Sequence, residues 1–380
     1  MELRDMIGHT ETLDWVLLAL FLTSSLIQSG YYLLVYLRFL LYKPETRRKS
    51  SKGISVIICA RNEAENLARF LPGVLEQDYP EFEVVVVNDG SADGTEDLLS
   101  EMTGRYSHLR FTSIPANEKF THGKKLALTV GLKSARYDHV LLTDADCYPV
   151  SNQWLQKMAS NLTRNRRIVL GYGGYERGRG LLNSMIRYET VFTAIQYLSF
   201  AIKGRPYMGV GRNLAYEKSL FFENRGFASH YHLRSGDDDL FINEIADGSN
   251  TVVEISRESH TWSIPEPTFR DWVKQKQRHL SAGTRYNTGT KIRLAGELIS
   301  RTLYYTTAIV LIIDSPWRWP VAALFGLIQA VRLVIFKLGF RRLDEQYLLL
   351  PSFMFDPIMP LLLVIIWFSN IFVTRYQPWH

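Results

Sequence analysis

An uncharged apolar run near the N-terminus constrains this chain more than any other feature. Residues 15–37 read WVLLALFLTSSLIQSGYYLLVYL and contain no acidic or basic side chain. A helix needs ~20 such residues to cross the core of a bilayer. A cleaved signal peptide is the alternative, but its apolar region is shorter, four acidic residues precede this run, and no small-residue cleavage site stands out. We therefore predict an N-terminal segment, 1–42, with a transmembrane helix at about 15–37.

Three further apolar stretches lie at 298–313, 319–336 and 348–373. The first contains Arg301, and the last is interrupted by Asp356, Pro357 and Pro360, so one of them could be re-entrant or interfacial. We predict a C-terminal membrane region, 298–380, with about three transmembrane helices. The chain would then cross the membrane about four times.

Basic residues flank these apolar segments. They form the linker KPETRRKSSKG at 43–53 and recur at Arg341 and Arg342. Four spans place both groups on one side, and cytoplasmic flanks carry the excess of Lys and Arg. The net charge of +6 therefore indicates a membrane partner rather than nucleic acid. With only Cys59 and Cys147 present, no disulfide framework is expected. We predict a cytoplasmic middle domain, attached to the inner membrane if the source is bacterial.

Between the membrane segments, residues 54–297 alternate strand and helix patterns. Apolar runs at 54–60, 83–89 and 139–146 have the length of buried parallel strands, and helical patterns at 63–75 and 95–103 lie among them. This order predicts an α/β domain with a Rossmann-like, mostly parallel sheet. Ligands bind at the carboxyl ends of such strands. The polar residues predicted at this edge are Arg61, Asn62, Glu63, Asp89, Asp144 and Asp146.

Two of these polar groups suggest a metal site. Asp144 and Asp146 follow an apolar strand and share a face in extended geometry, so both could bind a divalent cation and diphosphate oxygens. Mg²⁺ or Mn²⁺ suits oxygen ligands. Asp pairs also occur at strand ends without a metal. Asp89, in VVVNDGSADGT, could contact a base or ribose, or simply begin a turn.

A run of three carboxylates suggests a general base. Asp237, Asp238 and Asp239 are consecutive, and their repulsion must be relieved by a proton, a metal or a cation. A carboxyl with a raised pKa in such a cluster can accept a proton near neutral pH. An exposed acidic turn is the simpler interpretation, but the apolar LFI that follows favours burial.

Basic and amide side chains downstream suggest a diphosphate clamp. Gln275 and Arg278, in DWVKQKQRHLSAG, are three residues apart and share one face of a predicted helix. A basic surface helix that contacts lipid headgroups is the alternative. Lys124, in HGKKLALTVGL, could neutralise phosphate, although solvated lysines are more common.

The motifs ICARNEAENL, VVVNDGSADGT, HGKKLAL, LLTDAD, SGDDD and QKQRH occur in an order that resembles glycosyltransferase family 2, the inverting enzymes with the GT-A fold. The resemblance covers residues 54–283. It implies that residues 60–63 and Asp89 bind the donor nucleotide, with Lys124, Gln275 and Arg278 as further donor contacts. The first of these donor-binding residues is Ala60. It also assigns metal and diphosphate binding to Asp144 and Asp146.

The resemblance also implies the catalytic base. The family's Glu-Asp motif is replaced here by GDDD, so Asp237 and Asp238 are both candidates, and Asp238 is preferred if GDD stands for GED. Processive membrane members carry QxxRW, whereas His279 replaces the tryptophan here.

Together these observations predict an inverting transferase. It would move a sugar from a nucleotide-diphosphate-sugar to a lipid or lipid-linked acceptor, with Mg²⁺ or Mn²⁺ as cofactor. The alternatives are a processive polysaccharide synthase and a catalytically inactive nucleotide-binding membrane scaffold.

Overall fold

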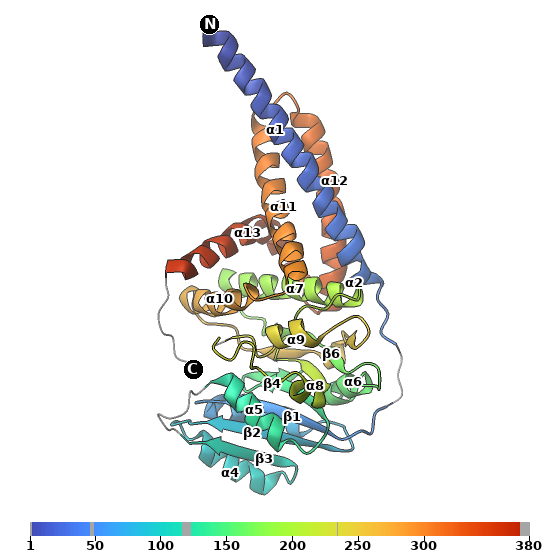
Figure 1. The fold of residues 1–380 in the computed structure, drawn as a ribbon, viewed down its shortest axis with the longest axis vertical. Helices are drawn as coiled ribbons and strands as arrows, with labels where there is room; N and C mark the ends of the chain where they lie inside the picture. The colour runs from blue at the N-terminus through green and yellow to red at the C-terminus, as the bar shows by residue number, and fades with distance from the viewer. Residues whose placement is uncertain (1, 46–48, 116–122, 234, 373–380) are drawn as a thin grey trace.

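The computed structural model describes residues 2–45, 49–115, 123–233 and 235–372. The remaining residues, which include part of the basic linker and the predicted apolar position Val373, lie outside it. The protein consists of an α/β domain and a stem of long helices that rises from it (Figure 1). A layer of helices separates the two parts.

The main sheet has seven strands in the order β3-β2-β1-β4-β8-β6-β9. The parallel half contains β3 (Leu109–Ile114), β2 (Phe82–Asp89), β1 (Ile54–Ala60) and β4 (His139–Asp144). Strand β8 (Leu214–Glu217) runs antiparallel to β4 and to β6 (Ile168–Leu170), and β9 (Thr251–Val253) pairs in parallel with β6. The predicted mostly parallel sheet is therefore confirmed.

Helices cover both faces of this sheet because its central strands are apolar on both sides. Val56 and Ile58 of β1 pack with α3 (Ala64–Leu75), α4 (Thr95–Arg105) and α6 (Trp154–Ser160), whereas Ile57 packs with α5 (Lys124–Ser134) on the other face. The two helices predicted at 63–75 and 95–103 thus correspond to α3 and α4.

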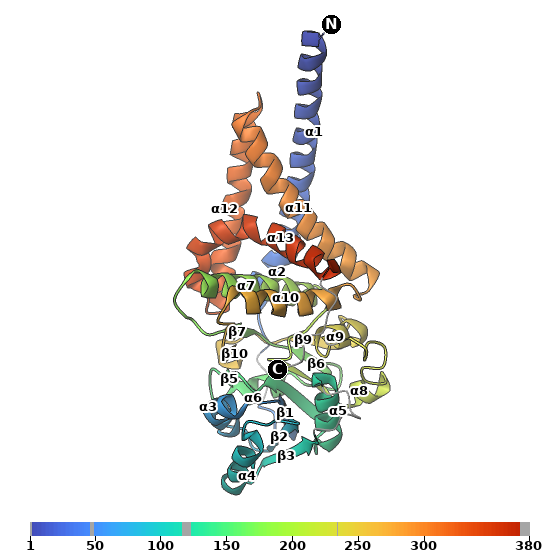
Figure 2. The ribbon, with the colours of Figure 1, turned by 90° about the vertical axis from the view of Figure 1, so that its left-hand side faces the viewer.

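A smaller sheet and two long helices close the edge where the parallel strands end. The sheet has the order β5-β10-β7 and contains β5 (Cys147–Pro149), β10 (Thr261–Ser263) and β7 (Gly173–Tyr175). Helices α7 (Leu181–Ile202) and α10 (Phe269–Gly283) lie side by side beneath the stem (Figure 2). The short helix α9 (Asp239–Ile245) packs against α10, whereas α8 (Ser219–Glu223) lies next to β8.

The stem contains α1 (Glu2–Tyr31), α11 (Thr288–Ile313) and α12 (Arg318–Arg342). A π-helical segment (Tyr32–Tyr36) and α2 (Leu37–Leu41) continue α1. Helix α1 packs against α11, where Gln28 donates to the Glu297 carbonyl at 3.1 Å and to Ser300 Oγ at 2.8 Å. Helix α11 begins at Thr288, so it starts before the domain boundary predicted at 297.

Helix α13 (Leu349–Phe372) lies crosswise over α7 and α10 rather than along the stem (Figures 1 and 2). Its Asp356 is fully buried and accepts from Arg301 of α11 and Arg332 of α12, each at 3.1 Å. Arg301 and Asp356, the charged residues that interrupt the first and last apolar stretches, are therefore paired with each other inside the bundle. Among the described residues, segments long and apolar enough to cross a membrane are 12–41, 318–342 and 346–369.

Candidate active site

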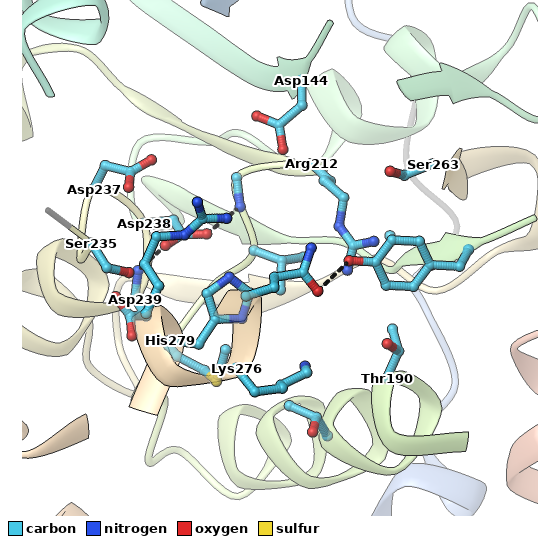
Figure 3. Close-up of a pocket in the computed structure, with 18 of the residues that line it drawn as sticks. Asp144, Thr190, Arg212, Ser235, Asp237, Asp238, Asp239, Ser263, Lys276 and His279 are labelled. Atoms are coloured by element: carbon cyan, nitrogen blue, oxygen red, sulfur yellow. Dashed lines mark hydrogen bonds between the residues drawn. The ribbon is translucent and has the colours of Figure 1, made fainter. Parts of the chain in front are cut away.

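A cavity of about 710 Å³ lies between the carboxyl ends of the parallel strands and helices α7 and α10 (Figure 3). Arg61 and Asp146 line it at the sheet. Thr190 of α7, Leu294 of α11 and Leu363 of α13 line it on the side of the stem. One space therefore connects the strand ends with the helices nearest the membrane segments.

Lys124 joins two of the predicted carboxylates. It begins α5, and its Nζ lies 2.8 Å from Asp144 Oδ1 and 3.3 Å from Asp237 Oδ2. Burial alone would lower the pKa of Lys124 and raise that of Asp144. The attraction between the two charges outweighs burial, so the pKa of Lys124 is raised and that of Asp144 is lowered. Both groups are therefore ionised at neutral pH.

Asp146 provides the second carboxylate of the strand-end pair. Burial and then the nearby charge of Asp144 raise its pKa, although Ser263 Oγ donates to its Oδ2. One ligand atom from each of Asp144, Asp146 and Cys147 lies within 4.8 Å of the others. Burial raises the pKa of Cys147, so this thiol stays protonated and is a poor ligand. The two carboxylates fit a hard divalent cation, whose charge would relieve their repulsion.

The acidic triplet has three different environments. Asp237 is buried against Lys124. Asp238 is half-buried and caps α9, and its oxygens accept from the backbone N–H of Gly211 at 2.6 Å and of Asp239 at 2.7 Å. Burial, followed by the charge of Asp237, raises the pKa of Asp238 to about 6.

Asp239 is hydrogen-bonded to the segment that leads from α10 into the stem. Its Oδ2 accepts from the hydroxyl of Tyr286 at 2.8 Å, in the link between α10 and α11. Asn287 donates its backbone N–H to Asn243 Oδ1 of α9 at 2.9 Å. Burial, followed by the charge of Asp238, raises the pKa of Asp239 to about 7. The triplet therefore forms a largely buried, hydrogen-bonded helix start, as the apolar residues after it indicated, and not the alternative exposed acidic turn.

Helix α10 contributes the predicted pair Gln275 and Arg278, and both line the cavity. Gln275 donates to Glu266 Oε1 at 3.1 Å and accepts from the hydroxyl of Tyr175 at 3.4 Å. His279 also lines the cavity. Desolvation by the surrounding protein, followed by the positive charges of Lys276 and Arg278, lowers the pKa of His279, so its imidazole is neutral at pH 7.

The remaining donor residues divide into two groups. Arg61 and Glu63 line the cavity, whereas Ala60, Asn62 and Asp89 are not among its lining residues. Asn62 has a positive φ of 55°, and its Oδ1 accepts from the backbone N–H of Ala92 at 2.9 Å. It therefore joins the loop after β1 to the loop after β2. Asp89 is fully buried at the end of β2.

The cavity lining also includes an arginine, Arg212, that the sequence motifs did not identify. Arg212 lines it and lies over the ring of Tyr175, with its Cζ 4.3 Å from the ring centroid. Its Nη1 donates to the Gly174 carbonyl at 3.3 Å. The segment VGRNLAY before β8 carries no pattern that would single out this arginine. Only the fold brings it to the carboxylates.

This α/β fold places a strand-end carboxylate pair and several basic side chains around one cavity, an arrangement suited to a metal and a diphosphate. Residues 55–223 match the family model described as glycosyl transferase family 2. The chain carries a glycosyltransferase domain of this family with the GT-A fold, as the resemblance predicted.

Curated relatives match part of the domain. A poly-beta-1,6-N-acetyl-D-glucosamine synthase from Staphylococcus epidermidis is 36% identical over 109 residues, which cover 29% of this chain and 25% of that protein. The Staphylococcus aureus (strain COL) synthase of the same name is 33% identical over 104 residues, 27% of this chain and 24% of its own length. The chain thus spans about a quarter of the length of these relatives.

One solved structure is similar over nearly the whole chain. The mannosyltransferase PcManGT from Pyrobaculum calidifontis, in complex with GDP-Man and Mn²⁺, has a TM-score of 0.58 and 19% identity. The match covers 91% of this chain and 99% of that one. It supports the fold, including the placement of long helices beside a GT-A domain.

Proposed function

We propose that the protein is an inverting glycosyltransferase that moves a sugar from a nucleotide-diphosphate-sugar to a lipid or lipid-linked acceptor at the membrane. The observation that carries this proposal is the cavity that extends from Asp146 at the sheet to Leu363 of α13. A soluble donor can enter at the strand ends, and an acceptor anchored in the bilayer can reach the same space from the side of the stem.

The donor end suits a nucleotide diphosphate. Asp144 and Asp146 would hold the divalent metal, which supplies charge neutralisation to the leaving diphosphate when bound. Arg278, Arg212 and Lys124 line the same cavity and can stabilise that negative charge directly. The complex of PcManGT with GDP-Man and Mn²⁺ supports a donor and metal of this type.

Asp238 is the proposed base. It faces the cavity, and the backbone N–H groups of Gly211 and Asp239 fix the direction of its carboxylate. Each oxygen has a further lone pair, which can accept a proton from an acceptor hydroxyl. With a pKa of about 6, Asp238 is ionised at pH 7 and still basic enough for this task. The acceptor oxygen then attacks the anomeric carbon opposite the leaving diphosphate.

The membrane arrangement follows from helix directions. We assign α1, α11 and α12 as spans because they run together in the stem, although α11 is less apolar than the other two. Helix α13 is apolar and long enough to cross a membrane, but it lies crosswise to the stem, so we assign it as an interfacial helix whose exposed apolar face, at Leu350, Phe353, Ile358, Leu361 and Ile365, lies in the bilayer surface. The basic residues at 43–53, Arg341 and Arg342 then favour a cytoplasmic α/β domain, with the end of α13 on the same side. One reporter that works only in the cytoplasm and one that works only on the opposite side would each be fused after residue 380. We expect activity from the first fusion alone, and activity from the second would mean that α13 crosses the membrane.

A polysaccharide synthase is the second candidate, because the curated relatives carry that name. Product size separates the candidates. A single transfer gives one product of fixed mass, whereas a synthase gives a ladder of polymer lengths.

Purified full-length protein in detergent tests the proposal. It would be supplied with Mn²⁺ or Mg²⁺, a panel of UDP-, GDP- and TDP-sugars and a membrane lipid extract, and released nucleotide diphosphate would be measured. We expect release that requires metal and lipid and is lost in Asp146→Asn and Asp238→Asn. Donor binding without turnover across the whole panel would contradict the proposal and support the inactive scaffold.

A further inference from the structure

The stem end of the cavity differs in charge from its sheet end. Helices α7 and α10 form its walls, and its lining includes the hydroxyl and amide groups of Thr190, Thr193 and Gln196 beside Leu294 and Leu363. These groups can donate and accept hydrogen bonds without carrying charge. An acceptor that enters from the bilayer must pass this part of the wall before it reaches Asp238.

The one lysine of this wall is already neutralised. Lys276 of α10 forms an ion pair with Glu189 of α7, and both side chains are almost buried. Glu189 also accepts from Thr193 Oγ1 at 3.3 Å. Breaking such a buried pair is costly, so the lysine is not available to an incoming anion. His279 is neutral for the reason given above and adds no positive charge.

The cavity lining is richer in carboxylates than in basic side chains, which disfavours an additional anion. The described lining contains eight carboxylates but only five arginines and lysines. A bound metal and the donor diphosphate largely neutralise each other, so the excess of carboxylates remains. Asp237, Asp238 and Asp239 all line this cavity (Figure 3). A phosphate monoester with a charge of about −1.5 to −2 at pH 7 would have to approach these groups.

We infer that the acceptor is a lipid with an uncharged, hydroxyl-bearing headgroup, bound between α7 and α10, rather than a lipid phosphate. This inference rests on the proposed function and adds the chemical class of its acceptor. It also explains why the site holds a base: a hydroxyl must lose a proton as it attacks, whereas a phosphate oxygen is already ionised.

Two lipids with the same chains test the inference. Dioleoylglycerol has a free hydroxyl, and dioleoyl phosphatidic acid carries a phosphate in its place. Native mass spectrometry of the full-length protein in detergent measures the binding of each without donor or metal, and nucleotide release measures turnover. We expect at least tenfold tighter binding and faster turnover with dioleoylglycerol. Equal or tighter binding of phosphatidic acid would overturn the inference.

The ion pair provides a matched set of variants. Glu189→Gln leaves Lys276 without its partner, so the preference should move at least tenfold toward phosphatidic acid, which corresponds to 1.4 kcal/mol. The double variant Glu189→Gln with Lys276→Met restores a neutral wall and should return the preference to that of the wild type. An unchanged preference in Glu189→Gln would show that this wall does not contact the acceptor headgroup.

The two readouts separate this inference from the proposed function. If the wild-type protein prefers dioleoylglycerol and Glu189→Gln moves this preference toward phosphatidic acid, but no donor is turned over, the transferase proposal fails and only the class of lipid bound between α7 and α10 stands. If turnover occurs with phosphatidic acid and not with dioleoylglycerol, the transferase proposal stands and the acceptor class is wrong.

Discussion

Replacing Asp238 by Asn should remove both the base and the acid limb of the pH profile. Asn is close in size and also caps helices well, so α9 should still begin at the same place. General base catalysis contributes about 10²- to 10⁴-fold, which is roughly 2.7 to 5.4 kcal/mol in the barrier. We expect kcat to fall by this factor, with little change in donor affinity.

The wild-type pH dependence follows from the pKa of about 6. Asp238 must be ionised to act as a base, so activity rises with pH through this value. About nine-tenths of the carboxyl is ionised at pH 7 and about one-tenth at pH 5, so kcat/KM should fall roughly tenfold between them. Nucleotide release measured from pH 5 to pH 8 gives this profile directly.

Asp237→Asn is the matched comparison within the triplet. The charge of Asp237 raises the pKa of Asp238, so its removal should move the acid limb to lower pH without abolishing activity. If Asp238→Asn kept more than a tenth of the wild-type kcat, or if its profile kept the same limb, Asp238 would not be the base.

Four further variants test the site and the stem. Asp146→Ala should abolish the rise in melting temperature that Mn²⁺ gives the wild-type protein, whereas an unchanged rise would place the metal elsewhere. Tyr286→Phe removes the hydrogen bond to Asp239 and should cost about 1–3 kcal/mol of unfolding free energy, measured by denaturant titration in detergent. Asp356→Asn leaves the buried Arg332 without its carboxylate partner and leaves Arg301 with Glu297 alone, so it should destabilise the stem by about 3–5 kcal/mol, seen as a lower melting temperature. Arg212→Met should raise the donor KM at least tenfold if this arginine contacts the diphosphate, and an unchanged KM would exclude that contact.

The sequence predicted those parts of the protein that depend on local patterns. The strand ISVIICA is apolar at every position except Ser55 because helices cover both sheet faces, so it could be recognised from sequence alone. The carboxylates at Asp144 and Asp146 follow such a strand, and strand ends meet at one edge of a parallel sheet. The placement of these groups in one cavity required only this rule.

The sequence could not predict contacts between distant segments. Arg212 reaches the cavity only because β8 pairs antiparallel with β4. The buried pair of Glu297 and Arg301 interrupts the apolar pattern of α11, so the apolar run marks only the later part of a helix that begins at Thr288. Likewise, the crosswise position of α13 depends on its packing against α7 and α10 and not on its composition.

The pairing of α1 with α11 has a consequence for synthesis of the chain. Gln28 finds its hydrogen-bond partner 269 residues later in the sequence. At ~5–20 residues per second, a ribosome needs roughly 15 to 50 seconds to make the intervening segment. During that interval the side-chain amide of Gln28 lacks its partners on α11, while the catalytic domain is already folding. If α1 spans the membrane as proposed, its Gln28 amide therefore needs another hydrogen-bond partner, such as water or the insertion machinery, until α11 has been made.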